Sequence, residues 1–245
     1  MRGVFFLREY FFPAGCALCG AGLLSADESW YGLCENCRGT LDEETAWLRV
    51  PQSNGGRCDL CGKLLISEHD RCISCRNNEE RGYDKLLTVF PYTGKYRALF
   101  AAYKFGKNLA VGRFFAEKIA EAMRTFADNE NGALPDIVPV PPRPGKIKTA
   151  GWDQVEYLTR LLERGMCGDA FATRRCLKRL PSKIQKQLDR KSRLENLRGR
   201  IVPVKKAPVF AVILDDVITT GSTMDVCASA LKERGSKTVY GISLV

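Results

Sequence analysis

Apolar residues follow two patterns along the chain, and the two patterns alternate after about residue 84. Short, nearly continuous apolar runs are typical of strands buried on both faces of a sheet. They predict strands over 85–92, 136–140, 208–216 and 237–245. Apolar residues at intervals of three and four are typical of helices that cover a core. They predict helices over 96–108, 109–127, 152–164 and 222–234. This alternation predicts an α/β fold with a parallel sheet flanked by helices.

The first part of the chain lacks this alternation. Cysteines, glycines and short turns dominate up to about residue 78, so we expect two modules, residues 1–78 and residues 79–245. The aromatic-rich start, "MRGVFFLREYFFPAG", is interrupted by Arg8 and Glu9, and its apolar stretch is too short for a signal peptide. We expect an amphipathic helix that docks on the protein, with a membrane-surface anchor as the alternative. No apolar run approaches the ~18–20 residues of a membrane span.

The eleven cysteines indicate metal binding in the cytoplasm. Eight of them form four Cys-x-x-Cys pairs, and the odd total argues against a disulfide framework. Two such pairs together supply the four thiolates of a tetrahedral zinc site. We expect two structural zinc sites, with an iron–sulfur cluster or a redox dithiol as the alternative. The sequence leaves open whether neighbouring pairs combine or cross over. The expected ligands are Cys16, Cys19, Cys34, Cys37, Cys58, Cys61, Cys72 and Cys75.

Positive charge is concentrated in one segment. The net charge of the chain is +10, and residues 174–200 contain eleven Lys or Arg against two acids. A local basic band favours a polyanionic partner more than evenly spread charge does. Three interpretations stay open: a lid over a reaction centre, a track for the phosphates of single-stranded DNA, and a solvated loop without a role.

Two acids at the end of a predicted strand mark the candidate ligand site. Asp215 and Asp216 lie where strand 208–216 ends, the position at which parallel α/β sheets bind ligands. The next residues turn into a helix, and their hydroxyls and free N–H groups suit a phosphate. The carboxylates would repel a bare phosphate, but they suit vicinal hydroxyls or a phosphate-bound Mg²⁺. A sugar phosphate with a free diol and a metal-bound pyrophosphate meets both demands, which indicates phosphoribosyl pyrophosphate (PRPP).

Residues 211–223, "AVILDDVITTGST", resemble the thirteen-residue signature of type I phosphoribosyltransferases at every position. The resemblance implies a phosphoribosyltransferase-like sheet in which Asp215 and Asp216 hold the ribose hydroxyls. It also implies that the loop after the strand wraps the 5′-phosphate. That loop comprises Thr219, Thr220, Gly221, Ser222 and Thr223.

Three further elements widen the resemblance: "YKFGK" (103–107), "VPVPP" (138–142) and "RLENLRG" (193–199). With the cysteine-rich N-terminus, they make nearly the whole chain similar to the ComF/GntX family of competence-associated phosphoribosyltransferases. The family's pyrophosphate loop then falls on residues 143–151, and its recurrent lysine on Lys104. Family positions in the basic segment fall on Gln185, Arg190, Arg193 and Asn196.

The implied pyrophosphate loop carries Arg143, Lys146 and Lys148 without an acid between them, which suits a diphosphate. The sequence departs from the family just after this loop. The usual arginine and asparagine are replaced by Ala150 and Asp153, so part of the pyrophosphate contact is in doubt. The aromatic residue and the glutamine are kept, as Trp152 and Gln154, and Trp152 is also expected to pack into the core.

These patterns predict a PRPP-binding protein linked to DNA uptake, with two structural zinc ions and with Mg²⁺ accompanying PRPP. Asp215, Asp216 and Lys104 are the expected catalytic residues if phosphoribosyl transfer occurs, but no acceptor site is recognisable. The alternative is a non-catalytic component of the DNA-uptake machinery that binds single-stranded DNA through residues 174–200. A third possibility is an interaction scaffold that binds zinc and neither ligand.

Overall fold

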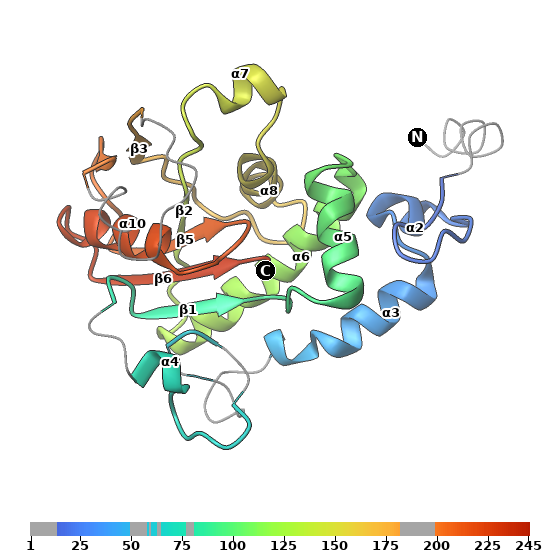
Figure 1. Cartoon of the computed structure of the whole chain (residues 1–245), viewed down its shortest axis with the longest axis horizontal. Coiled ribbons are helices and arrows are strands. Elements are labelled where there is room, and N and C mark those ends of the chain that lie inside the picture. Colours follow the sequence, from blue (N-terminus) through green and yellow to red (C-terminus); the bar gives the residue numbers. More distant parts are fainter. Residues whose placement is uncertain (1–13, 50–57, 59, 63–64, 77–80, 182–198) are drawn as a thin grey trace.

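The computed structural model describes residues 14–49, 58, 60–62, 65–76, 81–181 and 199–245. Its centre is a four-stranded sheet in the order β1-β6-β5-β2, with every neighbouring pair parallel. The strands are β1 (Lys85–Thr88), β2 (Asp136–Pro139), β5 (Phe210–Asp215) and β6 (Thr238–Ser243). Each falls inside a run that the sequence predicts as a strand, and the α/β fold with a parallel sheet is confirmed. Figure 1 shows the strands side by side, with helices in front and behind.

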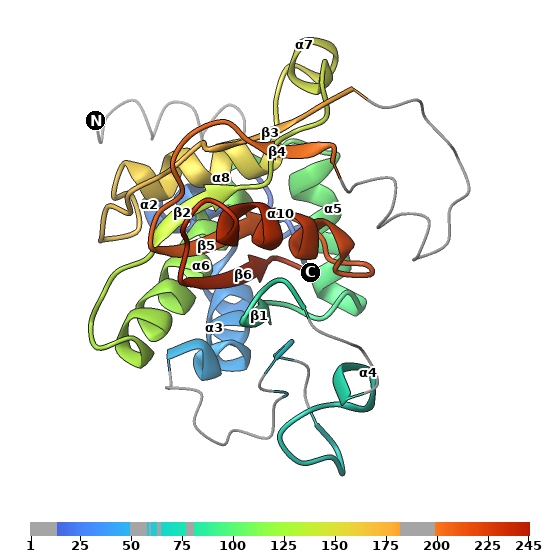
Figure 2. The same ribbon diagram turned by 90° about the vertical axis from the view of Figure 1, so that its left-hand side faces the viewer.

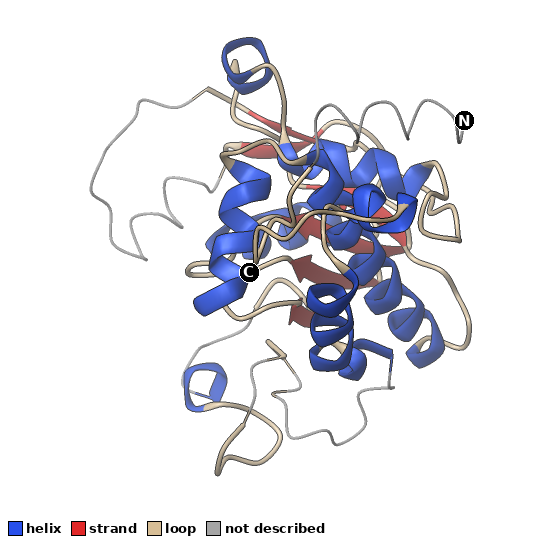
Figure 3. Ribbon diagram, turned by 90° about the vertical axis from the view of Figure 1, so that its right-hand side faces the viewer, coloured by secondary structure: helices blue, strands red, loops and turns tan. Residues whose placement is uncertain are grey.

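The sheet is buried on both faces because apolar residues point alternately to two groups of helices. On β5, Val212 and Leu214 pack with the residues of α6 and α8, whereas Ala211 and Ile213 pack with those of α10. Figure 3 shows strands between helices on both sides. These helices are α6 (Leu109–Asn129), α8 (Gln154–Glu163) and α10 (Ser222–Lys232). Their existence agrees with the sequence, and their ends differ by at most a few residues.

Four elements around the sheet differ from the sequence prediction. Helix α5 (Gly94–Lys104) begins two residues earlier than expected and ends before Gly106. A short helix, α7 (Lys146–Ala150), lies in the segment expected to be a loop. The sequence analysis missed two short antiparallel strands, β3 (Leu177–Arg179) in the basic segment and β4 (Ile201–Pro203) just after it. Figure 2 shows α7 and the β3–β4 pair at the end of the molecule opposite α4.

The cysteine-rich part forms two separate clusters rather than one body. The first cysteine cluster comprises Cys16, Cys19, Cys34 and Cys37, and the second comprises Cys58, Cys61, Cys72 and Cys75. Helices α2 (Ala26–Tyr31) and α3 (Glu35–Glu44) and the 3₁₀ helix η1 (Ala46–Arg49) accompany the first cluster. The short helix α4 (Ile73–Arg76) accompanies the second. The expected boundary between residues 78 and 79 stays a prediction.

The two clusters adjoin different parts of the α/β core. Beside the first cluster, the hydroxyl of Tyr31 and the guanidinium of Arg38 contact Glu117 of α6. Beside the second, the backbone N–H of Leu86 on edge strand β1 donates to the carbonyl of Leu60 at 2.6 Å. The expected N-terminal amphipathic helix lies outside the described residues. Within the described segments, no helix combines the length and apolar character that a membrane crossing needs.

Candidate functional site

A cavity of about 440 Å³ opens at the carboxyl end of the sheet. Strand β5 ends there at Asp215, and β2 runs parallel beside it and ends at Pro139. The cavity wall comes from α5, the segment after β2, α7, the start of α8, β3 and the end of β5. Its charged and amide side chains are Lys104, Arg143, Lys146, Asp153, Gln154, Arg179, Asp215 and Asp216. This is the edge at which parallel α/β sheets bind ligands.

Asp216 is held by two side chains from other elements. Its Oδ2 lies 2.6 Å from the ammonium nitrogen of Lys104 on α5 and accepts a hydrogen bond from Nε2 of Gln154 on α8. Burial raises the pKa of the Asp216 carboxyl, but Lys104 and Gln154 outweigh burial and hold it below its ordinary value. Asp216 is therefore a fixed negative charge in the wall of the cavity.

Asp215 has the opposite electrostatic character. Burial and the neighbouring Asp216 carboxylate raise the pKa of Asp215 well above that of an ordinary aspartic acid. The backbone N–H of Asp216 donates to its Oδ1 at 2.8 Å and only partly offsets this effect. The two adjacent acids thus form an unequal pair, and the position of Asp215 favours an added cation or hydrogen-bond donor.

Lys146 is paired with residues that follow the expected pyrophosphate loop. Its ammonium lies 2.6 Å from Oδ2 of Asp153 and donates to Oε1 of Gln154 at 2.7 Å. Gln154 therefore connects Lys146 to Asp216, while Oδ1 of Asp153 caps α8 by accepting from the N–H of Glu156. The aspartate at position 153, a departure from the family pattern, supplies the anion that fixes Lys146.

The loop 219–223, which comprises Thr219 to Thr223, leads directly into α10. Gly221 caps the helix with φ of 78°, a left-handed conformation that costs glycine little. The hydroxyls of Thr220 and Ser222 lie 2.9 Å apart and share a hydrogen bond. A second, smaller hollow is lined by residues 217–224 together with Asp215. Hydroxyls beside the N-terminus of an eleven-residue helix suit an anion.

Arg179 is a cavity residue that the sequence analysis did not single out. It lies on β3 next to the exposed Lys178. Burial is the main cause that lowers the pKa of Arg179, and the nearby positive charge of Arg143 adds to the decrease. Among the described residues, Arg179 and Arg143 form no salt bridge, unlike Lys104 and Lys146. The only signal in the sequence was membership of the basic segment, which does not distinguish one arginine from another.

Not every predicted site residue reaches the cavity. Lys148 is exposed on α7 and does not line it. Trp152 packs against the core, with its ring edge-on to that of Tyr103 at 5.4 Å between centroids, as its packing interpretation predicts. The positions expected in the basic segment lie outside the described residues. They are Gln185, Arg190, Arg193 and Asn196.

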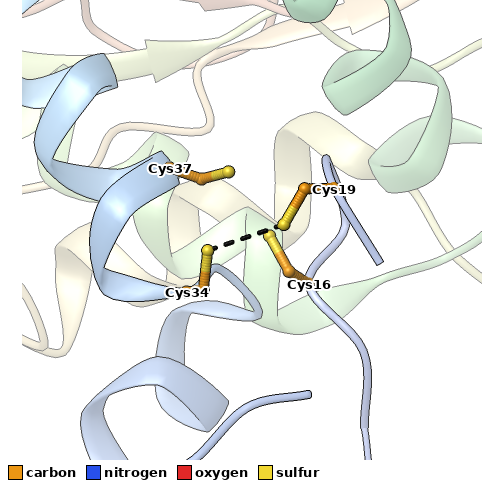
Figure 4. A group of neighbouring side chains, drawn as sticks. All are labelled: Cys16, Cys19, Cys34 and Cys37. Carbon is orange, nitrogen blue, oxygen red and sulfur yellow. Dashed lines mark hydrogen bonds between the residues drawn. The ribbon is translucent and has the colours of Figure 1, made fainter. Parts of the chain in front are cut away.

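Both cysteine clusters have the geometry of four-thiolate metal sites, and neighbouring Cys-x-x-Cys pairs combine in sequence. In each cluster the sulfur atoms lie within 4.8 Å of one another. The Cys61 and Cys72 sulfurs are 3.8 Å apart, about the separation expected for tetrahedral zinc with Zn–S bonds of ~2.3 Å. Figure 4 shows the first cluster, in which two side chains from the loop 16–19 meet two from the start of α3.

The environment of the sulfurs also suits thiolate ligands. Burial raises the pKa of the Cys16 thiol, but hydrogen bonds from backbone N–H groups lower it to about 7. The same balance lowers the pKa of Cys58 to about 7. One thiol of each cluster therefore favours the deprotonated form that binds metal, whereas burial and the neighbouring sulfurs raise the pKa of Cys37 and Cys75. His69 is exposed and belongs to neither cluster.

Comparison with known proteins supports the family suggested by the motifs. The chain is 27% identical to competence protein F of Haemophilus influenzae, over 92% of this chain and 93% of that protein. It is 26% identical to competence protein ComFC of Streptococcus pneumoniae, over 94% and 99% of the two chains. It is 28% identical to the DNA utilization protein YhgH of Escherichia coli, over 93% and 94%. The chain is thus similar to ComF proteins over nearly its whole length. No family model matches it. The ComF relatives are matched over both the cysteine-rich part and the α/β part, because the alignments span nearly the full length of each chain.

Proposed function

We propose that this ComF-like protein binds PRPP with Mg²⁺ in the cavity at the carboxyl end of its sheet and acts in DNA uptake. The observation that carries the ligand assignment is the convergence of two groups on one cavity. The acids Asp215 and Asp216 line this cavity with Thr223, and the rest of the loop 219–223 lines the smaller hollow that Asp215 also borders. Cations from three other elements, Lys104, Lys146 and Arg179, line the same cavity, and Lys104 pairs directly with Asp216.

Each part of PRPP then has a matching group. The ribose hydroxyls donate to the carboxylates of Asp215 and Asp216, which accept hydrogen bonds in their ionised form. The 5′-phosphate lies in the loop 219–223 at the start of α10. The pyrophosphate faces Arg143 and Arg179, which have no salt-bridge partner among the described residues and present planar guanidinium groups to it.

The acids of the cavity fit a divalent cation carried by the pyrophosphate. The raised pKa of Asp215 indicates a position where negative charge is poorly compensated in the free protein. A Mg²⁺ bound mainly by phosphate oxygens and water would supply that compensation without a cage of protein ligands. Lys104 and Gln154, which hold Asp216, keep its carboxylate fixed for hydroxyl recognition.

Calorimetric titration of PRPP in the presence of Mg²⁺ tests the site assignment. Binding to wild-type protein and loss of binding in Asp216→Asn are expected, because Asp216 is the ionised member of the pair. Unchanged affinity in that variant would contradict the assignment. Release of pyrophosphate in the presence of candidate acceptors then tests whether the bound PRPP is turned over. Phosphoribosyl transfer would make Asp215, Asp216 and Lys104 catalytic residues.

The role in DNA uptake rests on the relatives, whose names refer to competence and DNA utilization. A second candidate, a non-catalytic protein that binds single-stranded DNA, is favoured by the basic segment 174–200. Its first part includes β3, from which Arg179 lines the cavity, and it ends just before β4, the strand that pairs with β3. This candidate predicts DNA affinity that falls steeply with salt and is lost in the double variant Arg190→Ser/Arg193→Ser. Absent or salt-independent binding would contradict it, whatever the result with PRPP.

The two cysteine clusters complete the proposal as structural zinc sites. Small modules of this kind need metal to fold, because they bury little apolar surface of their own. An interaction scaffold without ligands would contain zinc and bind neither PRPP nor DNA. The calorimetric and DNA-binding measurements distinguish that outcome from both candidates.

A further inference from the structure

The second cysteine cluster and the loop 219–223 adjoin the same short segment, residues 81–83. Tyr83, Cys72 and Cys75 belong to one group of buried side chains, together with Met224 and Val226 of α10. The backbone N–H of Gly82 in this segment donates to the side chain of Asp225 on α10. The cluster and the start of α10 are therefore joined by packed atoms.

Asp225, in the first turn of α10, is bound by this segment at two points. Its Oδ2 lies 2.7 Å from Nη1 of Arg81, and both side chains are largely buried. Its Oδ1 accepts a hydrogen bond from the backbone N–H of Gly82 at 3.3 Å. A carboxylate held from two directions fixes both the position and the rotation of the first helical turn.

Gly82 allows the segment to touch the helix backbone. A Cβ atom at this position would lie 2.5 Å from the carbonyl oxygen of Asp225 and 2.8 Å from Oγ of Ser229. Both separations are shorter than a normal contact, so only glycine permits this approach. The spacing between the segment and α10 is therefore set by direct contact with little room for adjustment.

The same segment also borders the loop 219–223. A Cβ on Gly221 would lie 3.3 Å from Nη1 of Arg81 and 3.5 Å from the hydroxyl of Tyr83. Gly221 caps α10 and holds the turn whose N–H groups face the proposed 5′-phosphate. Arg81 thus contacts both the loop and, through Asp225, the helix that follows it.

Tyr83 extends these contacts toward the sulfur atoms. It is 3% exposed, and burial raises its pKa, with Asp225 and Cys75 adding to the increase and Arg81 opposing it. The buried Nε of Arg81 has no hydrogen-bond partner among the described residues. Among the described residues, Asp225 is the salt-bridge partner of the guanidinium, which also lies over the ring of Tyr83, 5.8 Å from its centroid.

We propose that the second cysteine cluster positions the loop 219–223, acting through Arg81, Gly82 and Tyr83. Metal bound at this cluster fixes the segment 81–83 against α10, and the segment fixes the loop. Arg81 and Gly82 are positioning residues in this account, since neither needs to touch the ligand. If the loop binds PRPP as proposed above, metal at the second cluster and PRPP raise the affinity of the protein for each other by the same factor.

The first cysteine cluster supplies an internal control. Its surroundings contact α6 through Tyr31 and Arg38, which pair with Glu117. Among the described residues, no hydrogen bond or salt bridge links α2 or α3 to α10. Loss of metal from the first cluster is therefore expected to leave the loop 219–223 in place.

Hydrogen–deuterium exchange of the full chain tests the positioning role without any ligand. In the variant Cys72→Ser/Cys75→Ser, amides 222–227 at the start of α10 are expected to exchange faster than in wild type. The matched variant Cys34→Ser/Cys37→Ser should leave their exchange unchanged. Equal protection in all three proteins would overturn the proposal. Faster exchange throughout the sheet as well would also overturn it, since that pattern indicates general unfolding.

A glycine variant tests the same contact with all cysteines intact. Gly82→Ala should speed exchange at the start of α10, whereas Gly39→Ala on α3, where a Cβ meets nothing within 4 Å, should not. Titration of PRPP with Mg²⁺ provides the second readout, and we expect Kd to rise about tenfold in Gly82→Ala alone. Unchanged exchange and affinity in Gly82→Ala would overturn the proposal. If wild-type protein binds no PRPP, the proposed ligand is wrong, and the exchange data still decide the positioning role.

Discussion

The ammonium nitrogen of Lys104 lies 2.6 Å from the carboxylate of Asp216, joining the end of α5 to the end of β5. These residues are far apart in sequence, and the ion pair exists because the parallel sheet brings both elements to one edge of the core. Lys104 also lies over the ring of Phe100, 5.2 Å from its centroid, which restricts the lysine side chain. Asp216 is therefore held as an oriented anion before any ligand arrives.

Replacement of Lys104 should weaken PRPP binding without abolishing the fold. In Lys104→Met, Asp216 loses its cationic partner, and one charge-assisted contact of this kind corresponds to about tenfold or more in affinity. Calorimetric titration of PRPP with Mg²⁺ measures the effect. Lys95→Met on the same helix is the matched control, because Lys95 pairs with Glu44 at 2.7 Å, away from the cavity. Equal losses in both variants would argue against a role for Lys104 at the site.

The unequal acids predict a pH-dependent gain in stability when Asp215 is neutralised. The folded protein raises the pKa of Asp215, so it binds the carboxyl proton of Asp215 more tightly than the unfolded chain does. The free energy of unfolding therefore falls as pH rises from the ordinary pKa of an aspartic acid to the raised one. Asp215→Asn removes this loss. The melting temperature of the variant relative to wild type should therefore rise between pH 5 and pH 8, by on the order of a few degrees.

Differential scanning calorimetry at several pH values checks this prediction in the absence of PRPP. Titrating groups that do not interact with Asp215 behave alike in both proteins, so they cancel in the difference. A difference that stays constant or falls with pH would mean that Asp215 is not held above its ordinary pKa. Asp215→Asn is expected to gain stability and to lose PRPP binding, a combination typical of residues that are kept for function.

Arg179 should contribute to binding through its position on the cavity side of β3. Arg179→Met removes a guanidinium that has no salt-bridge partner among the described residues, so PRPP affinity should fall about tenfold or more. The adjacent residue Lys178 is exposed on the same strand and carries the same charge, which makes Lys178→Met a matched control. Direct titration distinguishes them. Equal, salt-dependent weakening in both would indicate a general effect of charge.

The two clusters predict a metal stoichiometry that can be counted. Purified wild-type protein should contain two zinc ions per chain, since each group of four sulfurs forms one site. Cys34→Ser/Cys37→Ser and Cys72→Ser/Cys75→Ser should each lower the zinc content to one. Elemental analysis by mass spectrometry provides the count. Iron and acid-labile sulfide in place of zinc would favour an iron–sulfur cluster, and no metal in freshly reduced protein would favour a redox dithiol.

The parts of the structure that follow from local chemistry are predictable from the sequence. The apolar runs locate all four strands of the central sheet, because strands buried on both faces contain few polar residues. The spacing of Cys-x-x-Cys pairs indicates two four-cysteine sites, although the choice of sequential pairing needs the structure. The stretch Asp215 to Thr223 predicts a ligand loop, because acids, hydroxyls and a glycine occur there close together.

The parts that depend on contacts between distant segments are not predictable in this way. The β3 and β4 strands are three residues each, which is too short for a pattern of apolar and polar positions to reveal them. The connection of Lys146 through Gln154 to Asp216 requires three elements to converge. Nothing local to Arg81 or Gly82 reveals that they pack on α10, since their partner Asp225 lies 144 and 143 residues away.

The most direct test of the central claim is a calorimetric titration of wild-type protein with PRPP, with and without Mg²⁺. Ribose 5-phosphate, which lacks the pyrophosphate, serves as the matched ligand. The account predicts one PRPP per chain, affinity that depends on Mg²⁺, and weaker binding of ribose 5-phosphate that does not depend on the metal. No heat of binding for PRPP under any condition, or equal affinity with and without Mg²⁺, would contradict it.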